Sequence, residues 1–104
     1  MSGLEVTVED LEKGREEGAA VIDVREPYEW EAGRVPGAQL IPLGTLPARL
    51  DDLPRDTTVY VVCASGNRSY RAAELLVQSG IDARSVAGGT SAWARSGRPV
   101  ETGR

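Results

Sequence analysis

The chain contains no histidine and a single cysteine among its 104 residues. Histidine is the commonest metal ligand and the usual general base in proteins, so this chain lacks the usual residue for both roles. Zinc sites built from cysteine and histidine cannot be assembled from one such chain, and a Cys-His catalytic pair cannot form. If the cysteine reacts, a group other than imidazole must stabilise its thiolate.

The acidic residues are scattered and show none of the spacing of a calcium-binding loop. We therefore predict no metal site and no cofactor. The formal net charge of −4 disfavours nucleic acid as a partner, because binding to phosphate depends on clustered lysine and arginine.

A single cysteine also excludes an internal disulfide. The N-terminal segment MSGLEVTVEDLEKG lacks the basic region and the apolar core of a secretory signal, and no later apolar run approaches membrane-spanning length. We therefore expect a cytoplasmic protein with no membrane partner.

Short β-prone runs alternate with helical patterns along a chain of about one domain's length. This alternation predicts an α/β fold in which helices cover a parallel sheet. No internal repeat or linker is visible, so we predict one domain over residues 1–104. We expect its tail, from Val100 to Arg104, to fray.

Local signals place the elements. Thr7 and Asp10 have the spacing of a helix capping box. Pro27 and Gly33 mark the start and the end of a short helix over residues 26–32. The other predicted strands and helices are strands over residues 20–25, 57–63 and 83–87 and helices over residues 46–53, 72–79 and 88–97.

The cysteine, Cys63, ends the most β-prone run of the chain, and a loop that opens a helix follows it. In open α/β sheets ligands bind at this edge of the sheet. Gly66 gives the loop backbone freedom, and Asn67 belongs to the few residue types that tolerate left-handed geometry. Arg68 adds a cation with a planar donor fork. The loop amides, the start of the helix and this cation can together replace the missing histidine.

A lone cysteine at the end of an apolar strand is also often just a small buried hydrophobic residue. A purely structural turn has no need of an arginine at its rim, so the Gly-Asn-Arg-Ser continuation favours a reactive site. We therefore take Cys63 as the candidate nucleophile.

Three ordered motifs make the chain resemble one known family. CASGNRS, residues 63–69, resembles the active-site loop of rhodanese-type sulfurtransferases. DVREPYEWEAGRVPGA, residues 23–38, is similar to the family's Asp-Val-Arg segment and its Ile/Val-Pro-Gly-Ala turn. GGTSAWARSGRPV, residues 88–100, resembles its closing Gly-Gly, Trp and Gly-Pro pattern. Arg34 departs from the pattern, because such segments usually carry a histidine at this position. The resemblance therefore does not predict the contacts of this side chain beside the turn.

The resemblance covers nearly the whole chain and implies the family's rhodanese-like fold, a mainly parallel central sheet of about five short strands with helices on both faces. It also implies a thiosulfate sulfurtransferase that works through a persulfide. Cys63 would take sulfur from a small sulfur-donor anion such as thiosulfate, or from a persulfide donor, and pass it to a thiol or to cyanide. Arg68 would anchor the anionic end of the donor or the product. The residues whose amides would hold the persulfide are Ala64, Ser65, Gly66, Asn67, Arg68 and Ser69.

From the residues alone, two other functions stay open. Some phosphatases and arsenate reductases share the fold and place a cysteine before an arginine. Their loops are one residue longer than the four residues between Cys63 and Arg68 here, and the tighter loop suits a sulfur atom better than a phosphate. A binding module would not need the cysteine, whereas a non-catalytic sulfur carrier would need the same loop.

Other conspicuous residues carry weaker hypotheses. Asp23 and Arg25 lie at the same sheet edge as the cysteine, where they either brace the loop or form an ion pair that caps neighbouring turns. Trp93 is expected to pack rather than to bind a cofactor. Gly88 and Gly89 form either a second anion-binding nest or a plain turn.

Overall fold

A computed structural model describes residues 3–104 of the chain. Five parallel strands form one sheet in the spatial order β1-β5-β4-β2-β3. The strands are β1 (Glu5–Val6), β2 (Ala20–Asp23), β3 (Gln39–Leu40), β4 (Val59–Val62) and β5 (Ala83–Val86). The helices are α1 (Val8–Glu16), α2 (Pro27–Ala32), the 3-10 helix η1 (Leu43–Asp52), α3 (Asn67–Gln78) and α4 (Gly89–Arg95). The predicted α/β fold with a parallel sheet is confirmed.

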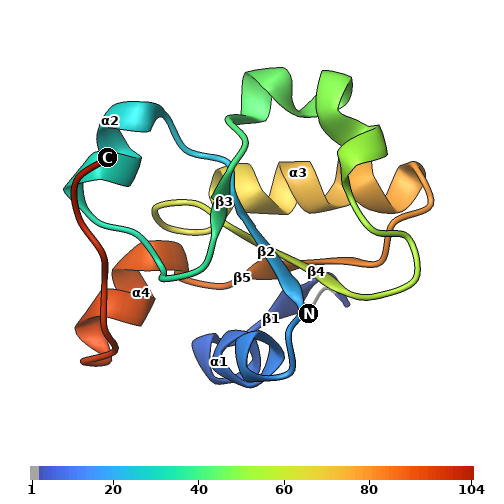
Figure 1. Ribbon diagram of the computed structural model, residues 1–104. Helices are drawn as coiled ribbons and strands as arrows, with labels where there is room; N and C mark the ends of the chain where they lie inside the picture. The colour runs from blue at the N-terminus through green and yellow to red at the C-terminus, as the bar shows by residue number, and fades with distance from the viewer. Residues whose placement is uncertain (1–2) are drawn as a thin grey trace.

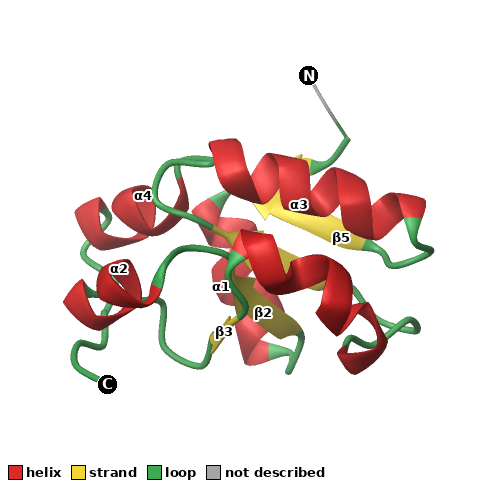
Figure 2. Ribbon diagram, turned by 90° about the horizontal axis from the view of Figure 1, so that it is seen from above, coloured by secondary structure: helices red, strands yellow, loops and turns green. Residues whose placement is uncertain are grey.

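Helices cover both faces of the sheet. In Figure 1, α3 and η1 lie on one face, and α1 and α4 lie on the other. Seen from above, α3 and η1 run side by side over the strands (Figure 2). Successive residues of β4 alternate between the two cores, as the pleat of a strand requires. Val61 packs in the core with Leu76 of α3. Val62 packs in the other core with Leu11 of α1 and Trp93 of α4.

The carboxyl ends of β2 and β4 mark the place where the chain changes direction across the sheet. The two strands are neighbours, but β4 leads to β5 on one side and β2 leads to β3 on the other. The crevice between such diverging connections is the usual ligand site of a parallel sheet. Cys63 directly follows β4, and Asp23 is the last residue of β2, so the fold brings both to this crevice.

Most local signals in the sequence correspond to the elements observed. The Thr7 hydroxyl accepts from the Asp10 amide at 3.1 Å, and the Asp10 carboxylate accepts from the Thr7 amide at 3.0 Å, which completes the predicted capping box. Gly80 follows α3 with φ of +88°, a left-handed conformation that favours glycine at a helix end. The segment around Leu46 forms a 3-10 helix, and Pro47 inside it has no amide hydrogen to donate.

The C-terminal tail is held against α2 rather than frayed, and its end lies beside that helix in Figure 1. Glu101 and Arg34 exchange backbone hydrogen bonds of 2.9 and 3.0 Å. The Gly103 amide donates to the Glu31 carbonyl at 2.8 Å. The guanidinium of Arg34, which is buried, donates to the carbonyl of Gly103. The prediction of a frayed tail was wrong, because the arginine that departs from the family pattern pins the tail down.

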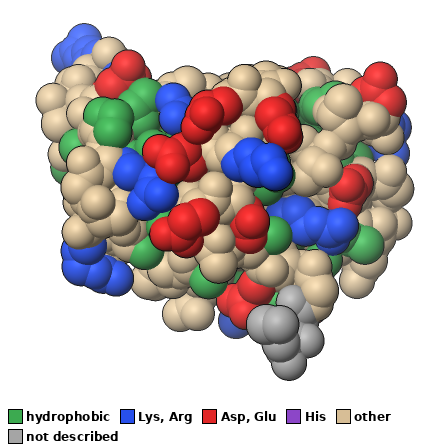
Figure 3. Space-filling view, turned by 90° about the horizontal axis from the view of Figure 1, so that it is seen from below, with side chains coloured by type: hydrophobic (Ala, Val, Ile, Leu, Met, Phe, Trp, Pro, Cys, Tyr) green, Lys and Arg blue, Asp and Glu red, His purple; other side chains and the backbone are tan. Residues whose placement is uncertain are grey.

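Charges of both signs are interspersed on the face formed by α1 and α4 (Figure 3). Arg98 Nη2, for example, lies 3.1 Å from Glu12 Oε1 and 3.8 Å from Glu9 Oε2. No helix within residues 3–104 is long and apolar enough to cross a membrane. Over the same residues, no three cysteine or acidic side chains gather as ligands for a metal ion.

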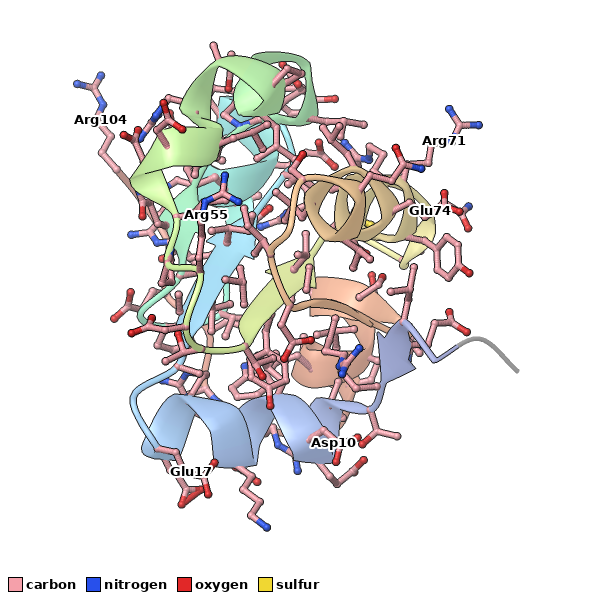
Figure 4. The ribbon with its side chains drawn as sticks, turned by 90° about the vertical axis from the view of Figure 1, so that its right-hand side faces the viewer. Asp10, Glu17, Arg55, Arg71, Glu74 and Arg104 are labelled. Carbon is pink, nitrogen blue, oxygen red and sulfur yellow. The ribbon has the colours of Figure 1, made fainter. Side chains whose placement is uncertain are left out.

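We predict that Arg34→Ala releases the tail. Losing the guanidinium removes charged hydrogen bonds to main-chain carbonyls, so the free energy of unfolding should fall by about 1–3 kcal/mol in a denaturant titration. The amide of Glu101 should then exchange with solvent rapidly. Arg104→Ala is the control, because that side chain extends into solvent (Figure 4). Continued protection of the Glu101 amide in Arg34→Ala would contradict this account of the tail.

Candidate active site

Cys63 lies in a tight loop between β4 and α3. The residue is only 1% exposed, and the backbone amide of Gly66 donates to its Sγ at 3.0 Å. Gly66 is the N-cap of α3 and has φ of +116°, a conformation that favours glycine. Cys63 therefore lies at the end of the buried strand β4, and the conformation of Gly66 points the Gly66 amide back toward Sγ.

The loop lowers the pKa of the Cys63 thiol. Burial by itself raises this pKa, but hydrogen bonds from the Ser69 hydroxyl and from the backbone amides of Ser69, Gly66 and Ser65 outweigh the effect of burial. None of these groups titrates. The hypothesis that the loop stabilises a thiolate without imidazole agrees with this geometry.

Two buried serines extend the hydrogen bonds of the thiol into the core. Ser69 Oγ lies 3.4 Å from Cys63 Sγ and 2.8 Å from the hydroxyl of Ser85 on β5. In the thiol form Ser69 donates to the Gly66 carbonyl at 3.1 Å. When the thiol ionises, Ser69 can turn its hydrogen to the sulfur while Ser85 donates to Ser69. Ser85 was not predicted from the sequence, although a polar residue within a buried strand is a signal of such a role.

The start of α4 is bonded to the loop backbone. The Thr90 amide donates to the carbonyl of Cys63 at 2.8 Å. The Ser91 amide donates to the carbonyl of Ala64 at 3.1 Å. Gly89 has φ of +54°, and a Cβ built on it would lie 2.3 Å from the Cys63 carbonyl oxygen. The glycine pair therefore lets the start of α4 approach the loop backbone closely.

Arg68 is an ion-paired cation. Its guanidinium makes a bidentate pair with Glu29 of α2, with both hydrogen bonds 2.8 Å long. These bonds lower the pKa of Glu29 to about 2, and they raise the pKa of Arg68 above its ordinary value. The charge of the cation predicted at the rim is thus partly neutralised, and the pair ties α3 to α2. The sequence analysis missed Glu29, because the partners are 39 positions apart and no local pattern links them.

Asp23 and Arg25 form a buried ion pair beside the loop, and they are 0% and 6% exposed. Arg25 Nε donates to Asp23 Oδ1 at 2.9 Å, and Nη2 donates to Oδ2 at 2.8 Å. The same Nη2 donates to the Gly33 carbonyl at 2.7 Å. The pair therefore joins the end of β2 to the end of α2. This matches the alternative in which it caps neighbouring turns, and Arg25 also lines a hollow next to the loop.

The remaining loop residues form the rim. Asn67 does not use the left-handed geometry that its residue type tolerates, because Gly66 adopts it and Asn67 begins α3. Ser65 and Asn67 are exposed, whereas Ala64 is half-buried. The loop thus turns the amides of Ser65 and Gly66 toward the sulfur and leaves the side chains of Ser65 and Asn67 in solvent.

Two hollows flank the loop. The larger, of about 470 Å³, is lined by the rim and by the outer face of α3, from which Arg71 and Glu74 extend (Figure 4). Its lining carries charges of both signs. The smaller, of about 280 Å³, is lined by residues of α2, α4 and the tail, with Ala64 as its contact with the loop.

Comparison with known proteins supports the resemblance seen in the sequence. A family model described as the rhodanese-like domain matches residues 7–96. A protein of Allochromatium vinosum named sulfurtransferase is 38% identical over 85 residues, which cover 81% of this chain and 79% of the relative. The crystal structure of a rhodanese-related protein from Thermoplasma volcanium aligns with a TM-score of 0.87 and 36% identity, over 93% of this chain and 96% of that one. A rhodanese-like domain protein of Staphylococcus aureus aligns with a TM-score of 0.84 and 35% identity, over 96% and 98%.

We predict that Gly89→Ala damages both the fold and the site. The new Cβ would collide with the Cys63 carbonyl oxygen, so the free energy of unfolding should fall by about 3 kcal/mol or more. Gly97→Ala is a matched control, because Gly97 has φ of +83° but open space around it, and should cost only about 1–2 kcal/mol. Denaturant unfolding of both variants measures the difference. Equal losses would show that the close approach of α4 to the loop is unimportant.

Replacing the Ser69 hydroxyl should raise the pKa of the Cys63 thiol. Ser69→Ala removes a hydrogen-bond donor to the thiolate, so the pH dependence of alkylation by iodoacetamide should move toward higher pH. Ser65→Ala keeps the backbone amide that serves the sulfur and should leave the profile in place. Superimposable profiles for the wild type and Ser69→Ala would rule out this role of the hydroxyl.

Proposed function

Since this chain belongs to the rhodanese-like domain family, we propose that it is a sulfurtransferase that carries sulfur as a persulfide on Cys63. The observation that carries the proposal is the Gly66 amide, which donates to Cys63 Sγ at 3.0 Å in a loop that favours the thiolate. A preformed thiolate is a nucleophile without a general base. The absence of histidine therefore suits this chemistry.

In the first half-reaction we propose thiosulfate as the sulfur donor. The Cys63 thiolate attacks the outer sulfur of thiosulfate, the sulfur-sulfur bond of the donor breaks, and sulfite leaves with the bonding electron pair. The product is a Cys63 persulfide anion, so the total charge is conserved. The loop amides of Ser65, Gly66 and Ser69 that lower the pKa of the thiol are the proposed donors to this anion.

In the second half-reaction an external thiol accepts the sulfur. The thiolate of the acceptor attacks the outer sulfur of the persulfide, and the Cys63 thiolate leaves. The acceptor must come from outside, because the chain has no second cysteine.

The pairing of Arg68 with Glu29 changes the role proposed for this arginine. A bidentate pair with both bonds at 2.8 Å is a stable arrangement, so Arg68 first positions the start of α3 against α2. Its side chain remains 36% exposed, so it can still meet an anionic donor at the rim. We therefore propose that the loop amides hold the sulfur and that Arg68 orients the donor.

Incubation with thiosulfate, without a reducing agent, should add the mass of one sulfur atom to the intact protein. Added thiol should remove this mass, and Cys63→Ser should never gain it. Steady transfer from thiosulfate to cyanide would distinguish an enzyme from a sulfur carrier that is loaded only once. Intact-mass spectra without any gain would refute the proposed function.

A further inference from the structure

The smaller hollow beside the loop has the features of a ligand site. Ala64 forms its contact with the loop, Thr90 and Ala94 of α4 line one side, and Val100 of the tail lines another. We propose that this hollow binds the sulfur acceptor and that the acceptor is a small uncharged aliphatic thiol. This inference rests on the proposed function, because it gives a place to the second half-reaction.

The hollow adjoins the residue that follows the nucleophile. Ala64 directly follows Cys63, and the Thr90 amide is bonded to the Cys63 carbonyl at 2.8 Å. Its volume of about 280 Å³ far exceeds that of one sulfur atom and lies just below the range of about 300–1,000 Å³ that is typical of ligand sites. A molecule of a few heavy atoms fits this space.

The charges around the hollow are already compensated. Arg25 is paired with Asp23, and Glu29 is paired with Arg68. The other lining residues are mostly small and apolar: Ala32, Gly33, Ala64, Ala94 and Val100. A charged ligand would lose its hydration here without gaining a free counter-ion, so an uncharged ligand is favoured.

The tail forms a fixed wall of the hollow. Val100 is 42% exposed and belongs to neither core, yet the residue after it is paired with Arg34 through two backbone hydrogen bonds. Val100 thus offers a ligand in the hollow a fixed apolar surface.

Thr90, which also lines the smaller hollow, carries a hydroxyl group. Its Oγ1 is buried and has no hydrogen-bond partner. Rotation about χ1 would therefore break no hydrogen bond. A thiol that also carries a hydroxyl group would satisfy this atom.

The acceptor thiolate R-S⁻ forms a bond to the outer sulfur of the Cys63 persulfide, and the bond between that sulfur and Sγ breaks. Cys63 leaves as the thiolate, R-S-SH takes the proton released when R-SH ionised, and no oxidant or reductant is consumed. The chain R would occupy the hollow while its sulfur reacts.

The test compares two thiols of nearly equal size, uncharged 2-mercaptoethanol and anionic mercaptoacetate. Protein loaded from thiosulfate is mixed with each, and loss of the persulfide is followed by intact mass. The wild type should react with 2-mercaptoethanol at lower concentrations than with mercaptoacetate. Ala94→Leu fills the hollow from an exposed helix position and should raise the 2-mercaptoethanol concentration for half-maximal rate about tenfold. Capture by cyanide, which is much smaller than the hollow, should be affected less than capture by 2-mercaptoethanol.

Two further variants sharpen the comparison. Ala48→Leu, an exposed alanine of η1 outside the hollow, is the control and should change nothing. Thr90→Val should weaken the use of 2-mercaptoethanol but not of ethanethiol, and it should not lower the midpoint of thermal unfolding, since the hydroxyl is unpaired. Equal use of the two thiols, or an Ala94→Leu variant that behaves like Ala48→Leu, would overturn the acceptor site.

A second reaction tests the hollow without a persulfide. The Cys63 thiolate attacks 2-hydroxyethyl disulfide, and a mixed disulfide forms while one 2-mercaptoethanol leaves as its thiolate. Ala94→Leu should slow this reaction about tenfold but not the reaction with the dianionic disulfide of mercaptoacetate. If thiosulfate adds no sulfur, the proposed function fails, and this second reaction alone then decides whether the hollow binds uncharged thiols.

Discussion

The hydrogen bond from the Thr90 amide to the Cys63 carbonyl is the contact on which the site depends. It joins the loop after β4 to the helix after β5, and it requires that Gly89 carry no Cβ. With this carbonyl held, the loop can turn its later amides toward the sulfur, and Gly66 completes the turn. Fixed backbone dipoles then stabilise the thiolate without titrating themselves, which is the part that imidazole plays in a Cys-His pair.

The charged side chains around the loop, like the backbone dipoles, are already in place in the free protein. Glu29 holds Arg68, and Asp23 holds Arg25, so the ionic groups next to the sulfur are already paired in the free protein. Each pair also joins two elements of the fold, α3 to α2 and β2 to the end of α2. The positive potential at Cys63 therefore comes mainly from amides and serine hydroxyls, whose positions are set by the sheet.

The position of the C-terminal tail also depends on one buried side chain. Arg34 is buried and bonds to the carbonyls of Trp30 and Gly103, and its backbone pairs with Glu101. These contacts hold Val100 at the edge of the smaller hollow. A segment that adds nothing to either hydrophobic core thus acquires a fixed shape beside the smaller hollow.

The sequence by itself determined the alternating fold, the capping box at Thr7 and the position of Cys63 at the end of a buried strand, because each of these depends on neighbouring residues. The loop amides followed from the same local pattern, through the freedom of Gly66. The pairing of Arg68, the hydroxyl contact between Ser69 and Ser85, and the pinning of the tail by Arg34 were decided only by the tertiary structure. These contacts join residues far apart in the chain, and strand order and helix packing, rather than any local motif, select their partners.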